Sequence, residues 1–85
     1  MEDWPEFHGL MLTAQETLSA NEASEIREFV EAREYVLALE ALCGMLVDAN
    51  KRVTPDLYYR IHSLAEQLGV APFVIEKVKA IVAPD

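Results

Sequence analysis

The sequence has few residues that form disulfides or interrupt helices: one cysteine, three glycines and four prolines in 85 residues. Cys43 alone cannot form an internal disulfide, and its apolar neighbours predict a buried thiol. The longest apolar run, from Tyr35 to Leu39, is far shorter than the roughly 20 residues that span a bilayer. We therefore expect no membrane partner. Because the first residues are acidic where a signal peptide is basic, we also expect a cytoplasmic protein.

Alternating strand-like segments and internal repeats are missing as well. The prolines and Gly69 fall where helices would begin or end, as chain punctuation predicts. We expect an all-α fold, a compact bundle of about five short helices in one domain covering residues 1–85. The predicted helices cover residues 5 to 12 or beyond, 20–32, 35–49, 55–68 and 72–82. Each is too short to be stable alone, so shared burial must hold the bundle together.

Capping signals support these boundaries. Thr13 with Glu16, and Ser19 with Glu22, both fit the capping box, in which a hydroxyl and a carboxylate satisfy each other's backbone amides. The second box is favoured because a clear helical pattern follows it. Apolar residues at helical spacing then predict a shared core made of Phe7, Leu10, Met11, Ala14, Ala23, Ile26, Phe29, Val30, Tyr35, Leu39, Leu42, Cys43, Leu46, Leu57, Ile61, Leu64, Leu68, Val74, Val78 and Ile81.

Basic residues are scarce. Fifteen acids against seven bases give a net charge of −8, and the imbalance is concentrated in residues 1–34. Such a surplus repels phosphates, so we expect no nucleic-acid partner and favour a basic protein partner. The alternative is that the acidity only keeps the protein soluble.

Catalytic and metal-binding motifs are also missing. The two histidines, His8 and His62, lie far apart and belong to no metal-ligand spacing, and no glycine-rich phosphate loop or Gly-x-Ser-x-Gly elbow is present. A thiol such as Cys43 among leucines lacks the activation that a nucleophile needs. We therefore expect no enzyme activity, no cofactor and no metal site.

Two groups of polar residues are candidates for partner binding. Glu25, Glu28 and Glu31, with Glu34 beyond them, lie opposite the apolar face of the second predicted helix. Capping, the helix dipole and an Arg27–Glu31 pair would explain part of this acidity by structure alone. On the fourth helix the group consists of Tyr59, His62 and Glu66, together with Ser63. An outward tyrosine among polar neighbours has the composition of a binding hot spot, unless another helix covers it.

A longer pattern resembles a known family. The segment Leu37-Ala38-Leu39-Glu40-Ala41-Leu42-Cys43 follows an acidic Glu-Tyr element, and a threonine-capped helix with tyrosine and leucines follows at residues 54–68. Together with a short final helix, this pattern is similar to the MafI family of immunity proteins over roughly residues 19–82. Val36 departs from this pattern, because the family has glycine after the tyrosine. A tighter or different turn between the second and third predicted helices is therefore left open.

The resemblance implies a small bacterial protein that protects a cell from a polymorphic or contact-dependent toxin. It implies no catalytic residues and does not fix the surface that touches the toxin. Many such toxins are nucleases with basic clefts, so an acidic bundle would bind in or beside the cleft, and charge would speed the encounter. The partner is then a toxin domain, a basic nuclease, and the acidic surface would centre on the glutamates of the second helix.

A helical adaptor or regulatory subunit is the rival interpretation. Leu37, Ala41 and Gly44 form a weakly polar stripe on the third predicted helix, and an adaptor would use this stripe for self-association. An immunity protein would be a monomer or a weak homodimer until it meets its target. Size in solution and the gene's neighbourhood separate the two interpretations.

Overall fold

Five helices form the described part of the chain, residues 5–83 of the computed structural model. They are α1 (Pro5–Ala14), α2 (Ala20–Glu31), α3 (Tyr35–Asp48), α4 (Pro55–Leu68) and α5 (Pro72–Lys79). The predicted all-α bundle is therefore confirmed. In this part of the chain the only β-type pairing is an isolated parallel bridge between Val53 and Val82. The acidic start of the chain, residues 1–4, lies outside the described residues.

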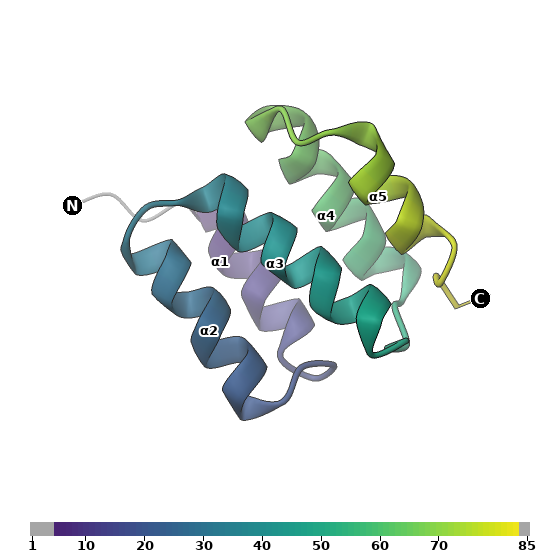
Figure 1. Ribbon diagram of the computed structural model, residues 1–85, viewed down its shortest axis with the longest axis horizontal. Helices are drawn as coiled ribbons and strands as arrows, with labels where there is room; N and C mark the ends of the chain where they lie inside the picture. Colours follow the sequence, from purple (N-terminus) through teal and green to yellow (C-terminus); the bar gives the residue numbers. More distant parts are fainter. Residues whose placement is uncertain (1–4, 84–85) are drawn as a thin grey trace.

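The helices form two layers, and α3 has the most central position (Figure 1). Helices α2 and α3 lie side by side in one layer, α1 packs against α4 in the other, and α5 packs against both α3 and α4. This central place follows from composition: α3 has uncharged residues around most of its circumference, so it can contact neighbours on several sides. Its outer face, between α2 and α5, remains open to solvent.

The core fills the space between the layers and contains apolar residues from all five helices. Most of the predicted core residues are buried, and the largest side chains with almost no exposed surface are Phe7, Leu10, Ile26, Leu39, Leu42, Leu46, Leu57, Ile61, Leu64, Val53, Val78 and Cys43. Seven predicted core residues are only half-buried and pack around its edge: Met11, Phe29, Val30, Tyr35, Leu68, Val74 and Ile81.

The expectation for α5 is partly wrong. Ile75 is its second fully inward residue, while Val74 is half-buried beside it. The helix ends at Lys79 rather than near Val82, so Ile81 lies in the turn that follows. After this turn the chain pairs with the segment before α4 instead of continuing the helix, because the Ala83 N–H donates a 2.7 Å hydrogen bond to the Val53 carbonyl.

One of the two predicted capping boxes forms. The Ser19 N–H donates to Glu22 Oε1 at 2.8 Å, and the Glu22 N–H donates to Ser19 Oγ at 3.1 Å. Thr13 does not cap a helix, because α1 continues to Ala14 and the Thr13 hydroxyl donates to the Gly9 carbonyl at 3.0 Å. A threonine inside a helix commonly bonds back in this way, which removes it from capping.

Residues with a left-handed backbone follow three of the helices: Arg33 after α2, Asn50 after α3 and Gly69 after α4. Gly69 adopts φ 76° at the end of α4, as predicted, because glycine reaches this region without a steric penalty. Between α2 and α3 the corresponding residue is Arg33, with φ 62°. Val36 lies inside α3, and the turn between α2 and α3 is made at Arg33.

Candidate protein-binding surfaces

The α2 surface consists of Glu25, Glu28, Glu31 and Glu34, and all four side chains are exposed. Among the described residues none of them has a cation within ion-pair distance, and the Arg27–Glu31 pair does not form. Residues three apart on a helix are displaced by about 60° around its axis. Glu25, Glu28 and Glu31 thus spread over the outer side of α2 instead of converging on one point.

Local structure explains only part of this acidity. Glu22 belongs to the first turn of α2 and to the capping box, whereas Glu25 lies beyond the first turn, where the helix dipole contributes little. Glu34 stands at the N-terminal end of α3, where a negative charge is favourable, although its side chain makes no capping bond. Glu25, Glu28 and Glu31 therefore have no structural role in the described contacts.

Glu22 is the acidic residue of α2 that the fold uses. Its carboxylate accepts a bond from the Ser19 N–H and lies 3.2 Å from the Lys51 ammonium. The Ser19 backbone hydrogen bond lowers the pKa of Glu22 below its ordinary value, and Lys51 lowers it further. This pair joins the start of α2 to the segment between α3 and α4.

The α4 surface consists of Tyr59, His62 and Glu66. Tyr59 is 69% exposed, so no other helix covers it. Its ring lies 5.7 Å from that of Tyr58, which in turn lies 5.9 Å from the imidazole of His62. His62 Nδ1 is 3.8 Å from Glu66 Oε1, one helical turn further along.

His62 and Glu66 also line a groove between α4 and α5. Its volume is about 280 Å³, and its lining residues are Tyr58, His62, Ala65, Glu66, Val70, Pro72, Ile75, Glu76 and Lys79. Tyr59 is not part of the lining, so the predicted α4 residues divide between a groove wall and an exposed aromatic beside it. This mixture of aromatic, apolar and charged groups is typical of a surface that contacts another protein.

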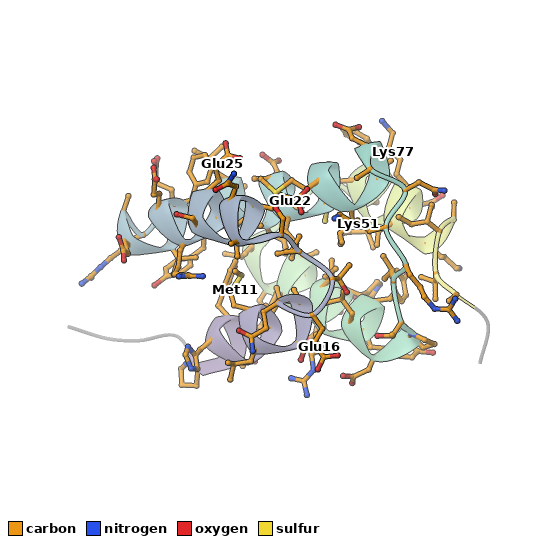
Figure 2. All side chains as sticks on the ribbon, turned by 90° about the horizontal axis from the view of Figure 1, so that it is seen from below. Met11, Glu16, Glu22, Glu25, Lys51 and Lys77 are labelled. Carbon is orange, nitrogen blue, oxygen red and sulfur yellow. The ribbon has the colours of Figure 1, made fainter. Side chains whose placement is uncertain are left out.

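The structure does not bring the α2 and α4 surfaces together. Helix α2 packs on α3 in one layer, whereas α4 packs on α1 in the other (Figure 1). Figure 2 shows Glu25 pointing out of the α2–α3 layer, on the side opposite Glu16, which follows α1. A compact partner would therefore cover only one of the two surfaces.

A third surface lies on the outer side of α3. Leu37 is 43% exposed, Gly44 is exposed and Ala41 is half-buried, so the predicted weakly polar stripe is present on the open face. Sequence reasoning missed its neighbour, Phe73, which is 65% exposed at the start of α5. The signal was available, because Phe73 is out of phase with the inward residues Ile75 and Val78.

A groove separates α3 from α5 on this face. It has a volume of about 210 Å³ and is lined by Glu40, Cys43, Gly44, Val47, Asp48, Phe73, Val74 and Lys77. The predicted buried thiol is confirmed: Cys43 is 1% exposed. Burial, and to a smaller extent the charge of Glu40, raise the pKa of Cys43 to about 12. The thiol therefore stays protonated and behaves as an apolar part of the wall.

Among residues 5–83, no group of three His, Cys, Asp or Glu side chains could hold a metal ion. None of the helices described has the length and apolarity to cross a membrane. A scan of the chain against protein-family models found no match, and searches of curated proteins and of solved structures found none either.

Proposed function

We propose that this protein is an immunity protein, which binds a bacterial polymorphic or contact-dependent toxin domain and neutralises it. The observation that carries the proposal is the α2 surface, where three exposed glutamates have neither an ion-pair partner nor a structural role in the described contacts. Unpaired acids of this kind raise the negative potential of the surface and attract a basic protein. The MafI-like sequence pattern supports the same assignment.

The mode of action follows from charge and shape. The target is a basic nuclease domain, whose cleft is positive because it must receive phosphate. The bundle measures 38 × 27 × 20 Å, and its α2–α3 layer, which carries the exposed glutamates of the α2 surface, covers such a cleft or its rim. Substrate is then excluded by occlusion, and electrostatic steering makes the capture fast.

Co-expression tests this proposal. The chain is produced together with the toxic C-terminal domain encoded immediately upstream of its gene, and cell survival and co-purification are scored. Survival with a stable complex is expected. Death of the cells with both proteins present at comparable levels, or an upstream gene that encodes no toxin, would remove the basis of the proposal.

The rival function, a self-associating adaptor, is favoured by one observation, the weakly polar stripe on the open face of α3, where Leu37 and Gly44 are exposed and Ala41 is half-buried. Sedimentation equilibrium of the free protein separates the two functions. A dimer that is lost when Leu37 is replaced by glutamate would favour the adaptor. A monomer would contradict the adaptor, because the stripe would then not mediate self-association.

A further inference from the structure

Two residues that line the groove between α3 and α5, Phe73 and Gly44, have exposed surface that the fold does not use. Phe73 is 65% exposed and Gly44 is exposed on the opposite wall, while Leu37, which is 43% exposed, lies on the same side of α3 outside the groove lining. Scattered exposed apolar residues are normal, but residues that gather around a depression indicate a contact surface. The groove's volume of about 210 Å³ is below the roughly 300 Å³ at which small-molecule pockets begin, so it suits protein side chains.

Gly44 gives the geometry of the contact. Glycine inside a helix costs about 1 kcal/mol relative to alanine, so its presence at the middle of α3 reduces the stability of the bundle. A Cβ added there would meet no atom within 4 Å, and the residue does not have the positive φ that favours glycine. Nothing in the protein's own packing requires glycine. A bare backbone at this point lets a second helix approach to the short end of the usual 8–10 Å interaxial distance.

The charges around the groove select the occupant. Glu40 and Asp48 stand on the α3 wall without an ion-pair partner among the described residues, and Glu25 points out on the same side of the molecule (Figure 2). The groove lining has two acids and one cation, Lys77, whose ammonium lies 5.9 Å from the centre of the Phe73 ring. Lys51 lies outside the lining and is paired with Glu22. A second copy of the chain would bring a net charge of −8 against this acidic face.

We propose that this groove, with its Gly44 wall and Phe73 rim, is the docking site for an amphipathic helix of the partner protein that has apolar residues on one side and lysine or arginine beside them. This inference rests on the proposed function, because it names the element of the toxin domain that the bundle binds. The apolar side enters the groove over Val47 and Phe73, and the basic residues face Glu40 and Asp48. This is the helix-in-groove mode of recognition, with anchors one turn apart.

A synthetic peptide tests the groove without the toxin. The probe is a helix of about 18 residues with leucines along one side and lysines elsewhere, titrated into the full-length ¹⁵N-labelled protein. The backbone signals of Gly44, Val47 and Phe73 should shift on binding. The Gly44→Leu variant should bind about tenfold more weakly because its side chain occupies the docking space, without a fall in Tm. Phe73→Ala should also weaken binding, and Gln15→Leu, which adds the same side chain at an exposed position that follows α1 in the other layer, should not.

Several results would overturn the inference. These are no binding, shifts confined to α2, equal binding by Gly44→Leu, or equal binding of a peptide in which glutamate replaces lysine. Signals of Gly44 and Phe73 that shift with protein concentration alone would make a second copy the occupant. The peptide experiment and the co-expression experiment test different claims. If the protein rescues cells but does not bind the peptide, the groove is not the docking site, and the proposed immunity function stands. If it binds the peptide but does not rescue cells, the groove is a docking site, and the proposed immunity function fails.

Discussion

At the scale of single residues, the informative positions are those where the residue present is not the one that stability favours. Gly44 is the clearest case, because alanine would fit and would support the helix better. Arg33 is another, because an L-residue with φ 62° carries a steric cost that glycine would avoid. At Arg33 the cost is a consequence of the turn between α2 and α3. At Gly44 no such reason exists within the bundle.

The first prediction concerns Gly44. The Gly44→Ala variant should be more stable than the wild type by about 0.5–1 kcal/mol, because the methyl group meets no atom and the unfolded chain loses freedom. Thermal or urea unfolding followed by circular dichroism measures this difference. Unchanged or reduced stability would mean that glycine serves the bundle itself, and the argument from its cost would fail.

At the scale of elements, capping and burial positioned the helices, and the sequence predicted both well where the signals were local. The Ser19 box, the Gly69 stop and the inward residues of α3 and α4 could be read from spacing, because each depends on neighbours within a few positions. Thr13 was misread because its pattern fits a cap equally well when the preceding helix continues. The end of α5 was misread because it depends on a bond to Val53, a distant residue.

The candidate surfaces show the same limit. The outward position of Tyr59 and of the α2 glutamates follows from helical phase and could be predicted. The Lys51–Glu22 pair and the groove beside Phe73 could not, because each joins helices or loops that are separated along the chain. Sequence patterns indicate which side of a helix is polar, but only the packing of helices determines which polar sides remain uncovered.

A second prediction concerns the start of α2. Ser19→Ala should lower the free energy of unfolding by about 1 kcal/mol, because the Glu22 amide loses its acceptor. Glu22→Gln keeps the geometry of the box and removes its charge. The folded-state pKa of Glu22 is lowered from 4.5, so its stabilisation is present above that pH and is lost as the pH falls through the folded value.

Urea unfolding between about pH 6 and pH 3 tests the charge. The stability difference between wild type and Glu22→Gln should shrink toward the acidic end of this range. Gln15→Ala, an exposed change outside the box, serves as the control. A difference that stays constant with pH would show that the Glu22 carboxylate does not titrate differently in the folded state.

At the scale of the whole molecule, the bundle separates stability from recognition. Its core is apolar throughout, and among the described residues no polar or charged side chain is fully buried. The charges lie outside, with Glu25 and Glu28 on the α2–α3 layer and a mixed aromatic surface on α4. Such an arrangement lets surface charge change with little effect on folding.

The most direct measurement of the central claim is the affinity for the proposed partner, a toxin domain encoded upstream, as a function of salt. Wild type should bind more weakly as salt rises, because attraction between the α2 surface and a basic partner is screened. The Glu25→Lys, Glu28→Lys double variant should bind at least about tenfold more weakly and with a flatter salt dependence. Glu16→Lys, compared with Glu25→Lys alone, makes the same charge change on the opposite side and should bind like wild type. Equal affinity and equal salt dependence for the α2 variants and the wild type would contradict the account.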